Sequence, residues 1–257
     1  MIYSEKDFQF SPYEDSRGSA GASGDLLLAK IKGKQYLIKH TVTSDVTNEF
    51  VAHKLALSID VPTTDAILIK KKNRGSCFIQ NYAVGIEVAE GFQRANLDHF
   101  VGQNDSPYIN DIMRYMAFRY MICLEDNVQL AYSNGKLISY DYAESFNNGE
   151  ISHKFMTITG DGRNAVTGYL NGISSLAFNY KSTIDILKLS DTKETRGAFY
   201  SPFYKFHEEK DKIQETILPE LIEAFPKVIA RFYYSCLYYL DEVIEKIIKT
   251  IEIETTN

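Results

Sequence analysis

The chain has 257 residues, of which 44% are hydrophobic and 24% are charged. These ordinary globular proportions exclude intrinsic disorder, collagen-like structure and extended coiled coil as descriptions of the whole chain. A formal net charge of -6 disfavours broad electrostatic binding to nucleic acid or to an anionic membrane, so we expect small molecules and proteins as partners.

Cysteine spacing and hydropathy predict a protein of the reducing cytosol. Cys77, Cys123 and Cys236 are odd in number and form no C-x-x-C pair, so we expect neither a disulfide framework nor a zinc site. No stretch reaches the roughly 18 uninterrupted apolar residues of a membrane span, and acidic residues precede any apolar run at the amino terminus. The expected location is therefore cytoplasmic, with no membrane contact.

The first hundred residues predict a sheet with one helix. Residues 25–39 hold two apolar runs around a Lys-Gly-Lys turn, which is typical of a β-hairpin. From Ser44 to the proline at position 62, apolar residues recur at steps of three and four, which predicts a helix of about four turns. Residues 65–72 and 76–83 predict a second strand pair joined by a short turn.

The middle of the chain predicts a helix followed by a hairpin. Residues 111–124 place seven apolar side chains on one face, which indicates an amphipathic helix packed on a core. The runs VQLAY and KLISY flank Ser133-Asn134-Gly135, and an Asn-Gly turn is the strongest short signal for a hairpin.

The last part of the chain predicts a long irregular segment followed by helices. Residues 147–180 are rich in Gly, Asn, Ser and Thr and show no sustained period. Helical spacing returns over residues 212–251, and the prolines Pro219 and Pro226 are expected to divide it into two or three helices.

Three features near the front of the chain together indicate a clamp for nucleotide phosphates. The loop GSAGASG enters a predicted strand, a lysine ends the following strand, and a glutamate lies ten residues later in the first turns of the helix. Glycines let backbone N–H groups approach phosphate oxygens, the lysine neutralises the phosphates and the glutamate holds the lysine. Taken singly, each has a plain structural role as a flexible turn, a solvated lysine or a helix-start glutamate. The candidate nucleotide-binding residues are Gly18, Ser19, Gly21, Ser23, Gly24, Lys39 and Glu49.

Two oxygen-bearing side chains flank the predicted Asn-Gly hairpin and are candidate magnesium ligands. Asn127 precedes the hairpin and Asp141 follows it. Hard cations select oxygen ligands, and a metal that bridges phosphates needs them on both sides of such a hairpin. The alternative is that Asn127 caps the corner and Asp141 starts a turn.

The order and spacing of these motifs resemble those of HipA-like serine/threonine kinases, in the HipT/CtkA-like branch. The resemblance is carried by GSAGASGDLLLAKIKGKQYLIK, by NEFVAHKLALSIDVPTTDAIL and by the segment 124–146, and it covers roughly the first 145 residues. It implies an α+β, two-lobed protein-kinase-like fold. An antiparallel, sheet-rich N-lobe is expected over residues 1–85 and a mainly helical C-lobe over residues 86–257, together forming one domain.

The resemblance also implies ATP and Mg²⁺ as cofactors and transfer of the γ-phosphoryl group to a protein hydroxyl, commonly in toxin or effector systems. Lys39 would bind phosphates, Glu49 would pair with Lys39, and Asp141, at the position of the Asp-Phe-Gly aspartate, would hold Mg²⁺. The implied partners are ATP, a protein substrate and a neutralising partner protein, and an effector would act in a host cytosol. Loop serines that the resemblance marks for autophosphorylation are Ser16, Ser19 and Ser23.

One position departs from the family pattern, which has a catalytic Asp five residues before the metal-binding Asn. Five residues before Asn127 stands Ile122. If Asp126 is the base instead, five residues after it stands Ala131, and Asn127 or Gln129 would have to supply the missing metal ligand. Either the corner is rebuilt around Glu125, Asp126 and Asn127, with Asp126 as the catalytic base beside Asp141, or the chain is a pseudokinase that acts through nucleotide or protein binding. Nucleotidylation of a protein on the same scaffold is a third alternative.

Overall fold

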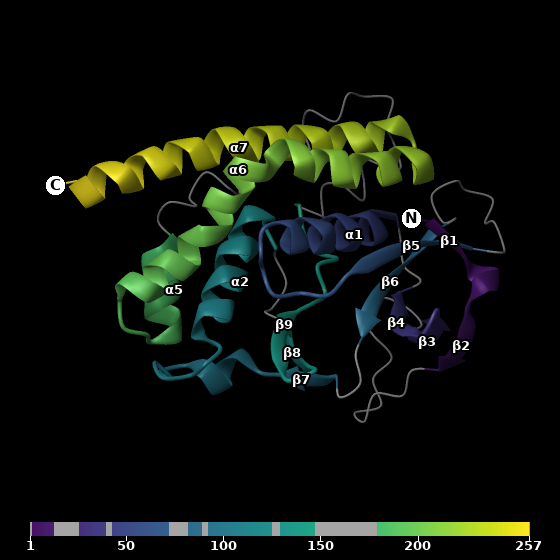
Figure 1. Ribbon diagram of the computed structural model, residues 1–257, viewed down its shortest axis with the longest axis horizontal. Coiled ribbons are helices and arrows are strands. Elements are labelled where there is room, and N and C mark those ends of the chain that lie inside the picture. The colour runs from purple at the N-terminus through teal and green to yellow at the C-terminus, as the bar shows by residue number, and fades with distance from the viewer. Residues whose placement is uncertain are drawn as a thin grey trace.

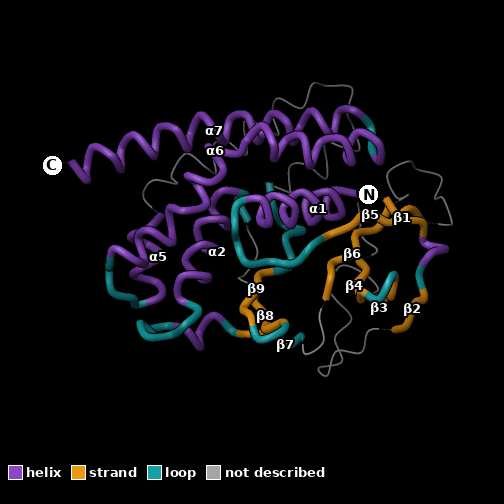
Figure 2. The backbone as a smooth tube through the Cα atoms, viewed as in Figure 1, coloured by secondary structure: helices purple, strands orange, loops and turns teal. Residues whose placement is uncertain are grey.

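The computed structural model describes residues 2–12, 26–39, 43–71, 82–88, 92–124, 129–146 and 179–256, which form a mixed α+β structure. The larger sheet lies at the right of the view, and two long helices lie side by side along the top of the molecule (Figure 1). One helix lies between the larger sheet and the two long helices, and the smaller sheet lies to the left of the larger sheet in this view (Figure 2). None of the described helices is long and apolar enough to cross a membrane.

The larger sheet has six described strands, and all of its neighbouring pairs are antiparallel except β1 and β5. In spatial order they are β1 (Ile2–Ser4), β5 (Ala66–Lys70), β6 (Tyr82–Val88), β4 (Lys34–Lys39), β3 (Leu26–Ile31) and β2 (Gln9–Pro12). Strands β3 and β4 are joined by Lys32 and Gly33, which both have positive φ, as a tight hairpin turn requires. The hairpin predicted over residues 25–39 is confirmed over its described part.

Side chains alternate between the two faces of this sheet. Ile67 and Ile69 of β5 pack into a small cluster with Phe8 and Tyr36, whereas Leu68 between them faces the main core. This period of two is the geometry of an extended strand. The face that carries Leu68 is covered by helix α1 (Thr43–Ser58), so α1 packs against the centre of the sheet.

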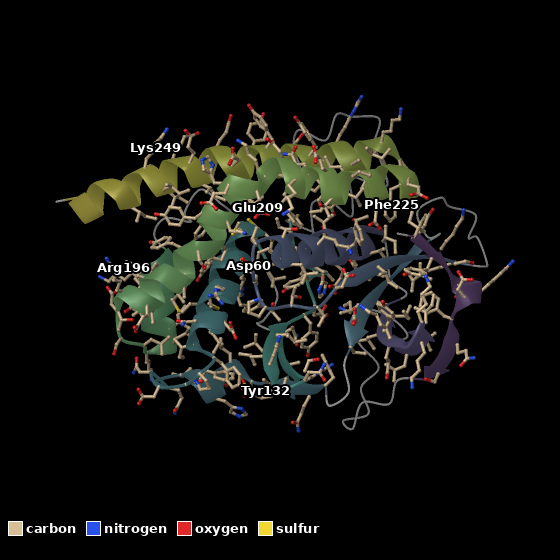
Figure 3. The ribbon with its side chains drawn as sticks, in the orientation of Figure 1. Asp60, Tyr132, Arg196, Glu209, Phe225 and Lys249 are labelled. Carbon is tan, nitrogen blue, oxygen red and sulfur yellow. The ribbon has the colours of Figure 1, made fainter. Side chains whose placement is uncertain are left out.

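Two long helices, α6 (Lys193–Ala224) and α7 (Lys227–Thr256), cover α1 from its other side. Helix α6 contacts α1, α2 and α7, and α7 runs back along α6 (Figure 1). Phe225, labelled in Figure 3, lies in the turn between these two helices. Its ring packs against that of Tyr82 in β6, with ring centroids 5.2 Å apart. The other described helices are η1 (Glu5–Asp7), η3 (Leu97–Phe100), α2 (Ile109–Met121) and α5 (Asn179–Leu187).

The smaller sheet has the described strand order β7-β8-β9 and lies next to α2. Its strands are β7 (Gln93–Ala95), β8 (Leu130–Ser133) and β9 (Lys136–Ser139). Asn134 and Gly135 join β8 to β9 with φ of 51° and 72°, which confirms the predicted Asn-Gly hairpin. The helices predicted near residues 44–61 and 111–124 are also confirmed, as α1 and α2.

The prediction that Pro219 divides the last helices is wrong. Both Pro202 and Pro219 lie inside α6, and only Pro226 separates α6 from α7. A proline removes one backbone hydrogen bond from a helix, but packing against α2 and α7 keeps α6 continuous. The strand predicted over residues 76–83 is described only at its last two residues, which begin β6, and residues 147–178 lie outside the described part.

Candidate active site

Lys39 is the last residue of β4, and its side chain is almost completely enclosed. The strand is held on both sides, because Lys39 is the ladder partner of Leu26 in β3 and of Val84 in β6. Its side chain is only 11% exposed. A buried ammonium group needs counter-charges, and two carboxylates supply them.

The first carboxylate belongs to Glu49, in the second turn of α1. The residue is fully buried because α1 is enclosed between the sheet and α6. Its Oε1 pairs with Nζ of Lys39, and its Oε2 accepts a hydrogen bond from the backbone N–H of Tyr142 at 2.9 Å. One side chain therefore joins the end of β4 to the chain that follows β9.

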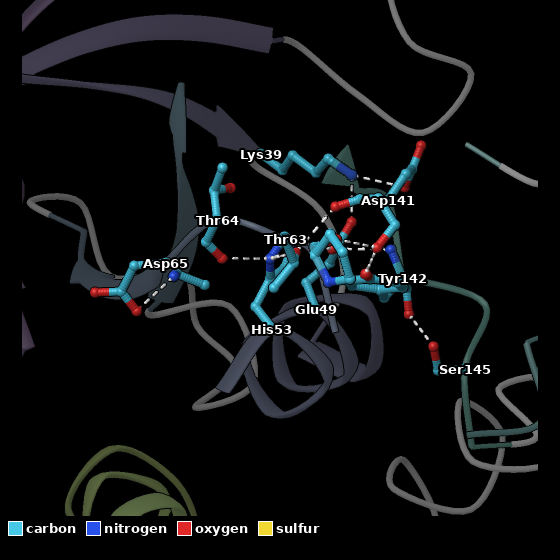
Figure 4. A network of polar contacts seen from close by, with 12 residues as sticks. Lys39, Glu49, His53, Thr63, Thr64, Asp65, Asp141, Tyr142 and Ser145 are labelled. Atoms are coloured by element: carbon cyan, nitrogen blue, oxygen red, sulfur yellow. Dashed lines mark hydrogen bonds and ion pairs between the residues drawn. The ribbon is translucent and has the colours of Figure 1, made fainter. Parts of the chain in front are cut away.

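The second carboxylate belongs to Asp141, two residues after β9 and 102 positions after Lys39. Its Oδ1 accepts a hydrogen bond from Nζ of Lys39 at 2.6 Å. The residue has a φ of 66°, in the left-handed region that Asp tolerates better than most residues. Its side chain is 33% exposed, and the second carboxylate oxygen points away from Lys39 (Figure 4). Asp141 can therefore hold Lys39 and still offer an oxygen to a ligand.

Lys39, Glu49 and Asp141, which we call the charged triad, shift one another's pKa values. Burial alone would lower the pKa of Lys39, but the Glu49 and Asp141 carboxylates raise it above its ordinary value. Burial alone would raise the pKa of Glu49, but the Lys39 ammonium and His53 bring it well below its ordinary value. Burial, reinforced by the Glu49 carboxylate, raises the pKa of Asp141 although Lys39 opposes this. One ammonium and two carboxylates leave one excess negative charge, which favours a cation at the exposed oxygen of Asp141.

A second layer of buried side chains lies behind the triad, with His53 at its centre (Figure 4). His53 Nδ1 is 2.8 Å from the carbonyl oxygen of Thr64, and since a carbonyl only accepts, Nδ1 carries a proton. Its Nε2 is 3.4 Å from Oε2 of Glu49, and its ring packs edge-on against Tyr142 with centroids 4.8 Å apart. The histidine spacing in the sequence gives no signal for this role, because the partners of His53 come from three separate segments.

The lowered pKa of Glu49 predicts how stability changes with pH. Because the folded-state pKa of Glu49 lies below its ordinary value of 4.5, its contribution is complete above that value and declines as the pH falls below it. The decline has a limiting slope of about 1.4 kcal/mol per pH unit. Urea unfolding of the wild type and of Glu49→Gln between pH 7 and about 3.5 should show a stability difference that is constant at the upper end and shrinks below pH 4.5. A difference that stays constant over the whole range contradicts this assignment.

Seven predicted site residues lie outside the described part of the chain, so their roles stay predictions. They are Gly18, Ser19, Gly21, Ser23, Gly24, Asp126 and Asn127. The nearest described residues lie beside the triad. Leu26, two positions after Gly24, is the ladder partner of Lys39, and Gln129, two positions after Asn127, accepts a hydrogen bond from the N–H of Tyr140, the neighbour of Asp141.

Comparison with known proteins finds similarity in structure only. No protein-family profile and no curated protein sequence matches the chain. The crystal structure of the Helicobacter pylori proinflammatory kinase CtkA superposes with a TM-score of 0.64 at 10% sequence identity, covering 100% of this chain and 99% of that chain. A chain in the Shewanella oneidensis MR-1 toxin–antitoxin complex of HipA, HipB and operator DNA gives a TM-score of 0.47 at 11% identity, covering 93% of this chain and 74% of that chain. The CtkA likeness confirms the fold class implied by the sequence resemblance: the chain has the α+β, kinase-like fold of CtkA, with a sheet-rich part and a mainly helical part.

Proposed function

We propose that the chain is an ATP- and Mg²⁺-dependent serine/threonine protein kinase that transfers the γ-phosphoryl group to a protein hydroxyl. The observation that carries this proposal is the charged triad, in which a strand lysine, a helix glutamate and an aspartate after a hairpin meet although 102 positions separate the lysine from the aspartate. The kinase-like fold of the chain supports the same conclusion. The N-lobe over residues 1–85 and the C-lobe over residues 86–257 stay predicted boundaries.

Lys39 is suited to hold phosphate oxygens. Its ammonium carries three N–H donors and makes ion pairs with both Glu49 and Asp141. The raised pKa of Lys39 keeps it charged at neutral pH. Glu49, held in turn by the N–H of Tyr142 and faced by His53, keeps the ammonium at the end of β4, beside Leu26 at the start of β3.

Asp141 is suited to hold Mg²⁺ through its exposed oxygen. Among the described residues there is no group of three or more His, Cys, Asp and Glu side chains that could hold a metal ion. Magnesium fits such a site, because it keeps several waters and binds through one or two carboxylates together with substrate phosphates. The predicted second ligand is Asn127 and the predicted base is Asp126. Bound Mg–ATP would supply the phosphoryl group, while these residues position it and neutralise charge.

One observation favours a second candidate, a pseudokinase. Ile122, at the position where the family pattern has its catalytic Asp, is fully buried in the core at the end of α2. An apolar buried side chain cannot accept a proton from a substrate hydroxyl. In this alternative the triad binds nucleotide and the chain acts through protein contacts. The neutralising partner protein likewise stays a prediction.

The experiment that tests the proposed function combines label transfer with thermal stability. With Mg²⁺ present, label from [γ-³²P]ATP should appear on protein, whereas label from [α-³²P]ATP would indicate nucleotidylation. Mg–ATP at 100 times its Kd should stabilise the fold by about 2.7 kcal/mol, and EDTA should abolish both effects. Stabilisation without transfer supports the pseudokinase. Absence of both stabilisation and transfer overturns both candidates.

A further inference from the structure

The C-terminal helix reaches the site through a buried tyrosine. Tyr233 of α7 is fully buried. Its hydroxyl donates to Oδ1 of Asn48 at 2.6 Å and approaches Oγ1 of Thr47 at 2.9 Å, both in α1. These contacts join residues 185 and 186 positions apart in the sequence, and Asn48 directly precedes the triad residue Glu49.

Asn48 also forms hydrogen bonds with the segment that follows Asp141. Its Nδ2 donates to the carbonyl oxygens of Ala143 and Ser145, each at 2.8 Å. Both N–H donors and the acceptor of the Asn48 amide are therefore used. Tyr142, in the same segment as Ala143 and Ser145, donates its N–H to Glu49. Two adjacent residues of α1, Asn48 and Glu49, therefore hold residues 142–145 by three hydrogen bonds.

Tyr233 also contacts this segment with its ring. It packs edge-on against Phe146, with ring centroids 5.3 Å apart at 88°, and the N–H of Phe146 donates to the carbonyl oxygen of Ile122 at 2.6 Å. Residues 142–145 are thus held by hydrogen bonds to Glu49 and Asn48. Phe146 is held by its ring contact with α7. Asp141 lies at the start of this fastened segment.

We propose that Tyr233 is a positioning residue for the kinase site, because its hydroxyl orients Asn48 and Asn48 holds the segment that carries Asp141. The inference rests on the proposed function and adds a residue to it that touches neither nucleotide nor metal. Removing a group that hydrogen-bonds directly to a metal ligand typically changes metal affinity or activity by about ten- to a hundredfold, and because Tyr233 acts one contact further away, through Asn48, we expect the lower end of this range. The C-terminal helix is therefore part of the machinery that sets the Mg²⁺ dependence of the enzyme.

The test uses Tyr233→Phe, which removes the hydroxyl and keeps the ring on Phe146. The Mg²⁺ concentration for half-maximal phosphoryl transfer should rise by about tenfold. Amide hydrogen exchange of residues 141–146, measured by mass spectrometry without nucleotide, should become faster. The matched control is Tyr180→Phe in α5, since the Tyr180 hydroxyl also contacts two side-chain oxygens, of Asp191 between α5 and α6 and of Thr195 in α6, away from the triad.

The outcomes separate this inference from the proposed function. The inference is overturned if Tyr233→Phe and Tyr180→Phe lose the same thermal stability and the Mg²⁺ concentration for half-maximal phosphoryl transfer by Tyr233→Phe does not change. Unchanged exchange over residues 141–146 also overturns it. If the wild type neither binds nor uses Mg–ATP, the proposed function fails, and the exchange result still decides whether Tyr233 positions the segment.

Discussion

Replacing Asp141 by asparagine should lower phosphoryl transfer by at least about a hundredfold, while the protein stays folded. The substitution keeps the shape of the side chain, and asparagine tolerates the φ of 66° as readily as aspartate does. It removes the charge that faces Lys39 at 2.6 Å and that would hold Mg²⁺. Initial rates at saturating ATP over a range of Mg²⁺ concentrations measure the loss.

The matched control for this variant is Asp65→Asn. Asp65 also pairs with a lysine, since Nζ of Lys54 in α1 lies 2.5 Å from its Oδ1, but this pair does not include a triad residue and the Asp65 side chain is 39% exposed. We expect the rate of phosphoryl transfer by Asp65→Asn to equal that of the wild type. If Asp141→Asn and Asp65→Asn have equal rates, Asp141 is not a metal ligand and the proposed site is in the wrong place.

Replacing Lys39 by methionine should have the largest effect on stability, about 3–5 kcal/mol. The variant leaves the fully buried Glu49 carboxylate without its ammonium partner and with Asp141 as a like-charged neighbour. Urea unfolding with an unchanged m-value measures the loss. Adding Glu49→Gln should recover a large part of it, because the double variant no longer buries an unpaired charge at position 49.

The control for this second prediction is Lys54→Met, which breaks the pair with Asp65. The carboxylate left behind in this control is 39% exposed to water, whereas Glu49 is fully buried, so the effect should be smaller than that of Lys39→Met. A double variant less stable than Lys39→Met would mean that Glu49 stabilises the fold by contacts other than the ion pair with Lys39. The hydrogen bond from Tyr142 is then the first candidate.

Local signals in the sequence were sufficient to find much of the fold. The Asn-Gly turn at residues 134–135 and the glycine at residue 33 favour hairpins, because Gly and Asn adopt positive φ at a lower cost than other residue types. Apolar spacing identified α1 and α2. The continuity of α6 through Pro219 was not predictable, because it depends on packing against helices that the local pattern does not contain.

The chemical types of the triad and the spacing of its members are written in the chain, which is why the sequence by itself points to Lys39, Glu49 and Asp141. Their meeting, their burial and the resulting pKa shifts were decided by the tertiary structure, because they require strand β4, helix α1 and the chain after β9 to converge on one point. The same holds for His53, Asn48 and Tyr233. Their contacts join segments up to 186 positions apart, and the free energy of such a contact depends on a burial that only the assembled fold supplies.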